Sequence, residues 1–498
     1  MSLAVVYSRA RAGMDAPLVS VEVHLSNGLP ALSIVGLPET AVKESKDRVR
    51  GAMLTAGFEF PARRITINLA PADLPKEGGR FDLPIALGIL AASGQIPGAE
   101  LSELEFAGEL ALSGELRAVQ GILPVALQTC KAGRTLVVPV ENTGEAALVR
   151  TARVLGGKHL LDITAHLTRT RRLPPADPVT VITAAADLPD LADVRGQQHA
   201  RRALEIAAAG CHSLLLLGPP GTGKSLLASR LPGILPEMSE SEALETAAIQ
   251  SICGRPIDAG NWKHRPFRAP HHTASGVALV GGGTNPGPGE ISLAHNGVLF
   301  LDELPEFDRR VLEVLREPLE SGHITISRAA RQAEFPARFQ LLGAMNPCKC
   351  GWLGDPSGRC HCTSEQVLKY RGKISGPLLD RIDMHVEVPR LGFDDMQGPQ
   401  GECSASVRIR VTATRNVQLH RNGTLNSRLT HQQIDTVCTL NESDRILLQQ
   451  AMTKLQLSAR AYHRILKLAR TIADMDEAEN IQTRHLMEAI NYRKLDRR

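Results

Sequence analysis

A glycine-rich loop that joins an apolar run to a lysine is the segment whose residue types and spacing most directly predict chemistry. The apolar residues 214–217 predict a strand, and the loop after them consists of Gly218, Pro219, Pro220, Gly221, Thr222, Gly223, Lys224 and Ser225. Glycines let consecutive N–H groups turn toward phosphates, Lys224 reaches the outer phosphates, and Ser225 offers its hydroxyl to Mg²⁺ at a helix N-terminus. The pattern predicts a P-loop that binds ATP, and the alternative is a chance match in a long, glycine-rich chain.

Two adjacent acids follow a second apolar run. Residues 298–301 are apolar, and Asp302 and Glu303 come directly after them. Asp302 would hold Mg²⁺ together with Ser225, and Glu303 would polarise the attacking water during transfer of a phosphoryl group to water. The alternative is an ordinary strand end with solvated carboxylates. Given the P-loop upstream, we expect an ATPase.

A third predicted strand ends at a polar amide. The apolar run 339–345 is followed by Asn346. An amide at the end of a neighbouring strand can lie beside the γ-phosphate and help to orient the water. Asn346 is therefore a candidate member of the same site.

Four cysteines crowd into fifteen residues directly after Asn346. They are Cys348, Cys350, Cys360 and Cys362, with His361 as a possible substitute ligand. Four thiolates satisfy tetrahedral Zn²⁺, and a thiol cluster in a reducing compartment binds metal more often than it forms disulfides. The Cys-x-Cys spacing is tighter than the usual Cys-x-x-Cys, so reduced cysteines without a metal are the alternative.

Length and composition bound the class of protein. A chain of 498 residues has material for two to four domains. Its apolar runs are too short to span a bilayer, and Arg9 and Arg11 stand where a signal peptide needs apolar residues, so we expect a cytoplasmic protein without a membrane partner.

The net charge is +4, but residues 401–498 hold 16 Lys and Arg against 10 Asp and Glu. That surplus fits contacts with DNA phosphates and fits an ordinary solvated helical surface equally well. An aromatic content of 3% argues against base stacking.

Proline-rich and glycine-rich segments divide the chain. Residues 1–165 mix alternating and helical patterns and predict an α+β domain. A proline-rich linker at 166–184 precedes an α/β nucleotide-binding core at 185–392. After a loop at 393–404, residues 405–498 predict a helical region, with helices at 430–440, 442–457, 459–474 and 482–491.

These motifs together resemble the AAA+ ATPases. Four further segments, 194–198, 268–275, 288–297 and 375–383, resemble the magnesium-chelatase-like branch of that family, and the likeness covers essentially the whole chain. The resemblance implies a parallel sheet with flanking helices followed by a helical lid, and it places Gly196 and Gln197 at the nucleotide. It also implies that Arg381 is an arginine finger that acts on the nucleotide of a neighbouring subunit, and that Arg460 is the sensor arginine of the lid.

The resemblance further implies a function. It points to a ring-forming, hexameric, ATP-driven helicase that acts on single-stranded and branched DNA and promotes branch migration during natural transformation. A protein-remodelling ATPase is the alternative. A motor subunit of magnesium chelatase is disfavoured by the N-terminal domain, which such subunits lack.

Two insertions are candidates for mechanical output. The stretch 275–289 contains three consecutive glycines and predicts an extended loop. The runs 323–327 and 332–335 flank Arg328 and Arg331 and predict a β-hairpin with a basic tip. In ring-shaped relatives such a hairpin faces the pore, so Arg328 and Arg331 are candidate DNA contacts, with a solvent-exposed turn as the alternative.

The N-terminal domain resembles the protease domain of Lon without its nucleophile. Where Lon-like proteases carry a catalytic serine this chain has the segment 76–82, which lacks serine, and where the catalytic lysine follows it has 120–124, which lacks lysine. Without a Ser–Lys pair there is no activated nucleophile. We therefore expect a non-proteolytic binding or assembly module.

Overall fold

The computed structural model describes residues 2–74, 76–177, 188–258, 260–283, 286–328 and 331–493. The chain divides into two compact units. The first unit comprises Met1–Ala184, Glu240–Trp262 and Ala329–Glu334, and the second comprises Ala185–Ser239, Lys263–Arg328 and Phe335–Arg498. The segment between the P-loop and the Asp302 strand thus contributes one piece, 240–262, to the first unit.

The first unit is built on a seven-stranded mixed sheet with the strand order β3-β4-β2-β1-β5-β8-β9. Its strands are β1 (Ser2–Arg9), β2 (Leu18–Ser26), β3 (Ala31–Val35), β4 (Arg64–Ala70), β5 (Leu104–Phe106), β8 (Thr135–Pro139) and β9 (Arg153–Gly157), and β6 (Glu109–Leu110) pairs separately with β7 (Leu116–Arg117). Strict alternation in β2 buries every second residue, so one face of the strand enters the core.

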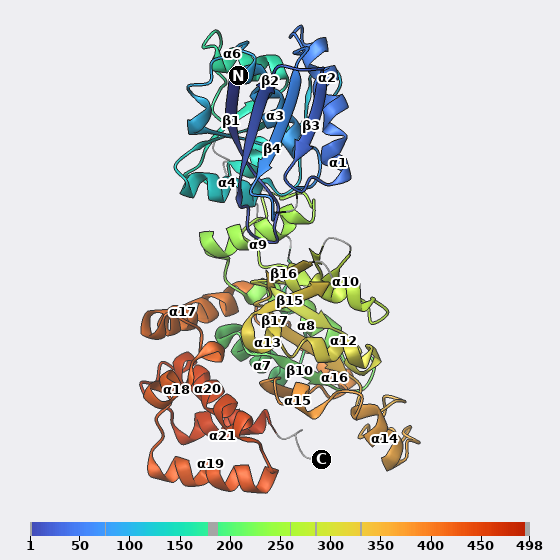
Figure 1. The fold of residues 1–498 in the computed structure, drawn as a ribbon. Coiled ribbons are helices and arrows are strands. Elements are labelled where there is room, and N and C mark those ends of the chain that lie inside the picture. The colour runs from blue at the N-terminus through green and yellow to red at the C-terminus, as the bar shows by residue number, and fades with distance from the viewer. Residues whose placement is uncertain are drawn as a thin grey trace. The chain divides into compact units, whose positions relative to one another are not determined.

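Helices complete the first unit. They are α1 (Thr40–Lys43), α2 (Ser45–Thr55), α3 (Asp82–Ala92), α4 (Ile122–Lys131), α5 (Val140–Ala146), α6 (Leu160–Leu167) and α9 (Glu240–Ile252). Helix α3 is apolar almost all round and lies against β1 and β2 (Figure 1). The linker was predicted at 166–184, but residues 166–167 belong to the end of α6. Residues 168–177 contain no helix or strand apart from an isolated bridge at Pro175, and the Ala176 N–H donates to the Val154 carbonyl at 2.9 Å. Residues 178–184 lie outside the described part.

The second unit contains a five-stranded sheet with the order β11-β14-β17-β10-β18. These strands are β11 (Phe267–Arg268), β14 (Val298–Leu301), β17 (Gln340–Met345), β10 (Leu214–Leu217) and β18 (Met384–Glu387), and all neighbours pair in parallel. Strands β10 and β17 are buried along their whole length, as expected for a parallel sheet covered on both faces. Because the strands are parallel, the residues that follow β10, β14 and β17 meet at one edge of the sheet.

Helices flank this sheet and continue into a C-terminal helical region, which confirms the expected fold class. The helices before that region are α7 (Gln198–Gly210), α8 (Lys224–Ile234), α10 (Gly276–Val280), α11 (Glu290–Leu293), α12 (Arg309–Val314), α13 (Pro318–Ser321), α14 (Ser364–Arg371), α15 (Gly376–Leu379) and α16 (Phe393–Gln397). The C-terminal region consists of α17 (Ser404–Asn422), α18 (His431–Val437), α19 (Glu442–Leu455), α20 (Ala459–Met475) and α21 (Thr483–Asn491) (Figure 1).

The C-terminal helices and the sheet share one hydrophobic core. Leu214 and Leu216 of β10 belong to the same buried cluster as Ile465 and Leu468 of α20 and Tyr492. The helical region is therefore packed onto the sheet of the second unit and not merely connected to it by the chain.

Both insertions contain regular structure. The stretch 275–289 was expected to be an extended loop, but it forms α10 and the short pair β12 (Gly281–Gly282) and β13 (Gly287–Pro288). Ser275 explains the helix, because its side chain accepts the Ala278 N–H as an N-cap. The predicted hairpin is present as the two-stranded sheet of β15 (His323–Arg328) and β16 (Arg331–Pro336).

Among the described residues, no helix is both long enough and apolar enough to cross a membrane.

Candidate nucleotide site

The P-loop joins β10 to α8, and its lysine is already held in the loop. Gly223 caps α8 with a φ of 85°, a left-handed conformation that favours glycine, and Lys224 is the first helical residue. The Lys224 ammonium donates to the Gly218 carbonyl at 2.7 Å and to the Pro219 carbonyl at 2.8 Å. Burial lowers the pKa of Lys224, although the carboxylates of Asp302 and Glu303 act in the opposite direction. Because burial disfavours the charged form of Lys224, an anionic ligand at the loop would stabilise its ammonium.

Asn346 lies beside that lysine. The Asn346 side-chain oxygen accepts from the Lys224 ammonium at 3.1 Å. Strand β17, which ends one residue before Asn346, pairs in register with β10, so the hydrogen-bonded sheet fixes the position of the amide. The structure thus brings together two residues that lie 122 positions apart in the chain.

Ser225 and Asp302 form the second contact across this edge. The Ser225 hydroxyl donates to Asp302 Oδ2 at 2.5 Å, and the other Asp302 oxygen accepts the Glu303 N–H at 2.9 Å. Hydroxyl and carboxylate oxygens are ligands that Mg²⁺ prefers, and the ion usually takes one or two of them beside phosphate oxygens and waters. The oxygens of Ser225 and Asp302 therefore fit a shared Mg²⁺.

Glu303 occupies a constrained position at the end of β14. Its φ of 51° places it in the left-handed region, and its side chain is about half exposed. A histidine lies beside it: His272 Nδ1 is 3.5 Å from Glu303 Oε2. His272 was not among the residues to which the sequence assigned a role. The signal was its place in the segment 268–275, which carries the family resemblance but no recognised catalytic pattern.

Gln197 contacts the P-loop from the other side. Its amide donates to the Pro389 carbonyl at 2.7 Å and reaches the Thr222 carbonyl at 3.5 Å. Gly196 and Gln197 both have positive φ, so this turn approaches the loop with its backbone bent. Gln197, which was predicted to contact the nucleotide, therefore lies next to the P-loop.

Arg381 lies at the opposite edge of the sheet. It precedes β18, whose first residue, Met384, pairs with Leu214 at the amino end of β10. The Arg381 guanidinium is 2.6 Å from Glu320 and donates to the Pro377 carbonyl at 2.7 Å. Four strand residues, about 13 Å, separate the two edges, so Arg381 does not join the P-loop of its own chain.

The first turns of α20 lie near the same edge. Arg464 forms an ion pair with the buried Asp383, which also accepts the Ser213 N–H at 2.9 Å and lies 3.5 Å from His212. Burial alone would raise the pKa of Asp383, but Arg464 and His212 outweigh it, and the pKa lies well below its ordinary value. Arg460 is exposed, one helical turn or about 6 Å before Arg464. Arg460 is thus on the side of Arg381.

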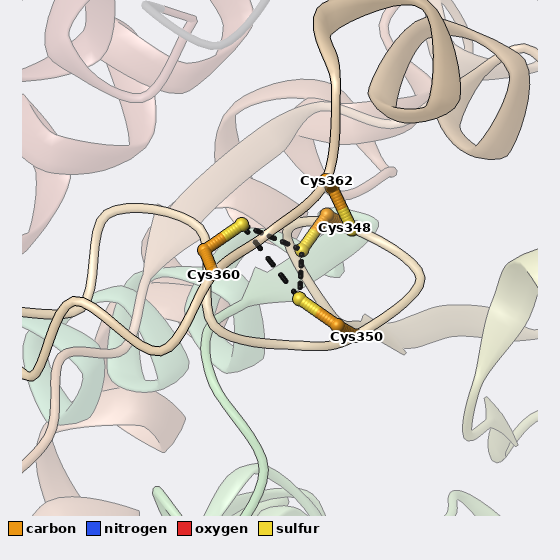
Figure 2. Close-up of side chains that lie close together, drawn as sticks. All are labelled: Cys348, Cys350, Cys360 and Cys362. Carbon is orange, nitrogen blue, oxygen red and sulfur yellow. Dashed lines mark hydrogen bonds between the residues drawn. The ribbon is translucent and has the colours of Figure 1, made fainter.

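The four cysteines of the segment 348–362 converge. The sulfur of Cys348 lies 3.3 Å from that of Cys350 and 3.8 Å from that of Cys360, and the sulfurs of Cys350 and Cys360 are 3.7 Å apart. With Cys362, all four sulfurs lie within 4.8 Å of one another (Figure 2). His361 is not part of this cluster.

The candidate DNA contacts, Arg328 and Arg331, border residues that lie outside the described part of the chain. Arg328 closes β15 and Arg331 opens β16, but residues 329–330 and the side chains of both arginines lie outside the described part. Their role stays a prediction.

In the first unit, the segments 76–82 and 120–124 lie together. The Arg80 guanidinium donates to the Gln120 carbonyl and is nearly buried. Burial lowers the pKa of Arg80 to about 10. Lys76 is also buried, and its ammonium donates to the Pro71 carbonyl. The lysine of this region is therefore bound to backbone rather than to a hydroxyl nucleophile.

Comparisons with known families divide the chain in three. The model "Magnesium chelatase, subunit ChlI" matches residues 190–396, "Subunit ChlI of Mg-chelatase" matches 21–142, and "Magnesium chelatase, subunit ChlI C-terminal" matches 401–493. The first covers the sheet of the second unit with its P-loop.

Curated relatives extend the likeness to the full length. The chain is 54% identical to "Competence protein ComM" of Haemophilus influenzae, over 100% of this chain and 98% of the relative. It is 50% identical to "Uncharacterized protein YifB" of Escherichia coli, again over 100% and 98%. It is 26% identical to "Magnesium-chelatase 38 kDa subunit" of Cereibacter sphaeroides, over 39% of this chain and 56% of the relative.

Proposed function

The chain belongs to the family of ComM and YifB, and on that premise we propose that it is an ATP-driven, ring-forming DNA helicase that promotes branch migration during natural transformation. The ATPase part of the proposal rests on the geometry of the site. The DNA part rests on the relative named for competence and on the predicted basic hairpin.

One observation carries the ATPase activity. Lys224 with Asn346, and Ser225 with Asp302, join the ends of β10, β14 and β17 at a single edge of the sheet. A cation, an amide, a hydroxyl and a carboxylate so arranged match what phosphoryl transfer needs, because that reaction depends on positioning and on neutralising charge. In the proposed complex, Lys224 leaves the Gly218 and Pro219 carbonyls and binds the outer phosphates.

The remaining residues at this edge act on the water. Mg²⁺ held by Ser225 and Asp302 would neutralise charge on the phosphate oxygens. Glu303, whose carboxylate is half exposed, accepts the proton of the attacking water, and Asn346 orients that water. His272, whose Nδ1 lies 3.5 Å from Glu303 Oε2, is placed to position that carboxylate.

Arg381 completes the site of a neighbouring subunit in a proposed hexamer, and Arg460 is the sensor arginine of the lid. The placement of Arg381 at the edge opposite the P-loop supports its role, because an arginine there is too far from its own phosphates and is available to another chain. A guanidinium suits this task because it stays charged and can pair with two oxygens at once.

The test is ATP hydrolysis by the full chain without DNA, with linear duplex, and with a branched four-strand DNA, followed by a strand-exchange measurement on the branched substrate. Stimulation by branched DNA together with ATP-dependent branch movement supports the proposal. If the rate of hydrolysis is the same with and without each DNA, and no branch movement occurs, the helicase assignment is wrong and only the ATPase assignment stands.

A protein-remodelling ATPase is the second candidate. Residues 190–396 match the magnesium chelatase model, and the chain also resembles a magnesium-chelatase subunit. Neither name refers to DNA, so this similarity favours a motor that acts on a protein partner. Stimulation by a protein partner and not by DNA would separate it from a helicase.

A further inference from the structure

We propose that Cys348, Cys350, Cys360 and Cys362 bind one Zn²⁺ in a closed, structural site that holds the Asn346 loop against the P-loop. The metal-binding part is independent of the proposed function. The part that concerns Asn346 rests on it.

The sulfur positions fit tetrahedral zinc. A Zn–S bond of about 2.3 Å in tetrahedral geometry places the sulfurs about 3.8 Å apart. The sulfurs of Cys348, Cys350 and Cys360 are 3.3, 3.7 and 3.8 Å apart, and the fourth sulfur lies within 4.8 Å of each. Figure 2 shows the sulfurs of Cys348, Cys350 and Cys360 joined by dashed lines around a common centre, with the Cys362 side chain beside them. An ion at that centre needs only small shifts of the side chains.

The chain connectivity also suits a metal. Cys348 and Cys350 come from the segment that leaves β17, whereas Cys360 and Cys362 come from the segment that enters α14. The residues between these arms form turns without helix or strand. A few exposed turns cannot bury enough apolar surface to order themselves, and a metal supplies that order in small loops. Four thiolates leave no open position for substrate, so the site is structural.

The loop with the first two cysteines contacts the nucleotide site directly. Cys348 is two residues beyond Asn346 and is fully buried. Gly351, which follows Cys350, has a φ of +86° and lies so close to Pro220 of the P-loop that a Cβ would be 2.8 Å from the Pro220 ring. Only glycine tolerates both the conformation and the approach.

The second arm is fastened to the same backbone. Arg371, at the end of α14, donates from Nε to the Pro347 carbonyl at 3.1 Å. Cys362 directly precedes Thr363, whose hydroxyl accepts the Gln366 N–H and caps α14. A metal that joins the two arms therefore fixes Pro347, and with it Asn346, from both sides.

The first experiment measures metal in the full chain purified without chelator. We expect about one zinc per chain, and cobalt substitution should give the visible spectrum of tetrahedral thiolate coordination. Cys360→Ser and Cys362→Ser should lose most of the zinc. Cys403→Ser, which changes an exposed cysteine outside the cluster, should keep it. A wild-type protein that is folded and metal-free would overturn the site.

The second experiment tests the link to Asn346. Cys360 is suitable because it lies on the arm remote from the P-loop. If the zinc acts by positioning Asn346, Cys360→Ser and Asn346→Ala should each reduce hydrolysis, and the double variant should be no slower than Asn346→Ala alone. Additive losses would show that the zinc does not act through Asn346. If wild type binds zinc but hydrolyses no ATP, the metal site stands and the proposed ATPase fails.

Discussion

The guanidinium of Arg381 lies 2.6 Å from the carboxylate of Glu320, and its side chain is about 5% exposed. Arg381 is the residue proposed to reach the nucleotide of a neighbour, yet within one chain it is paired internally. Engagement with a neighbour must therefore exchange one anion, the Glu320 carboxylate, for another, the phosphate. This exchange makes Glu320 a competitor of the proposed contact between subunits.

Replacing Glu320 with glutamine should make assembly easier. The amide keeps the shape and an acceptor oxygen but removes the charge that competes for Arg381, so half-maximal ATPase activity should occur at a protein concentration lower by a few-fold. Glu317→Gln removes a charge from the same short segment and should leave that concentration unchanged. An unchanged or higher concentration for Glu320→Gln would contradict the competition.

Replacing Glu303 with glutamine should preserve ATP binding and reduce turnover about 100-fold or more, because the amide cannot accept the proton of the attacking water. Lys224→Ala should instead weaken nucleotide affinity. Affinity for a fluorescent ATP analogue and steady-state hydrolysis, measured on the same preparations, separate the two effects. Wild-type turnover in Glu303→Gln would show that another group activates the water.

Mixing two inactive variants should restore activity. Arg381→Ala chains keep an intact P-loop, and Lys224→Ala chains keep an intact arginine, so mixed interfaces contain one working pair. Because an arginine finger contributes about 10³-fold or more, even a minority of such interfaces should raise hydrolysis well above either variant alone. Native mass spectrometry must confirm mixed assemblies, and if these form without hydrolysis, Arg381 has no role in trans.

Replacing both Arg328 and Arg331 with alanine should reduce DNA-stimulated hydrolysis and leave basal hydrolysis nearly intact. Loss of two phosphate contacts should lower the slope of log affinity against log salt by about 1.4 to 1.8. The double variant Arg484→Ala and Arg445→Ala, which removes two exposed arginines of the C-terminal helices, is the matched control. An unchanged slope would move the DNA contact away from the hairpin.

Acid should destabilise the second unit through Asp383. The pKa of this carboxyl is lower in the folded protein than in the unfolded chain, so its contribution to the free energy of unfolding is complete above the unfolded value, near 4, and declines as the pH falls toward the folded pKa. Asp383→Asn should cost about 3 kcal/mol at pH 7 because Arg464 loses a buried partner, and its stability should depend less on pH below 4. Thermal melts at pH 7, 5 and 3 measure both effects.

The residues at the carboxyl edge of the sheet could be predicted because each follows an apolar strand at a fixed offset. This pattern predicted Lys224, Asp302 and Asn346. In the structure Lys224 contacts Asn346, and Asp302 contacts Ser225, the residue after Lys224. Glu320 and His272 could not be predicted, since an ion pair across 61 residues or a histidine beside a remote carboxylate leaves no periodic pattern. Such partners are set by tertiary packing.

Helix α17 shows a different limit. It was absent from the predicted helices, although it is the longest in the described part of the chain. Its buried face contains Thr414, Arg415 and Gln418 beside two valines, so apolar periodicity does not reveal it. The Arg415 guanidinium donates twice to the Ala208 carbonyl, at 2.9 and 2.6 Å, near the end of α7. A polar side chain there satisfies a carbonyl that the helix leaves without a partner.

The closeness of the four sulfurs also has a practical side. Two thiols 3.3 to 3.8 Å apart form a disulfide readily once no metal binds them and dissolved oxygen accepts the two electrons and two protons, and the same oxidant can convert single thiols to sulfenic and sulfinic acids. A purification that uses a strong chelator and no reductant would then yield a mixture of chemical forms, in which each disulfide lowers the mass by two hydrogens and each oxidation step adds an oxygen atom. Variation in specific activity between batches should follow the history of the sample, and free-thiol titration should track it.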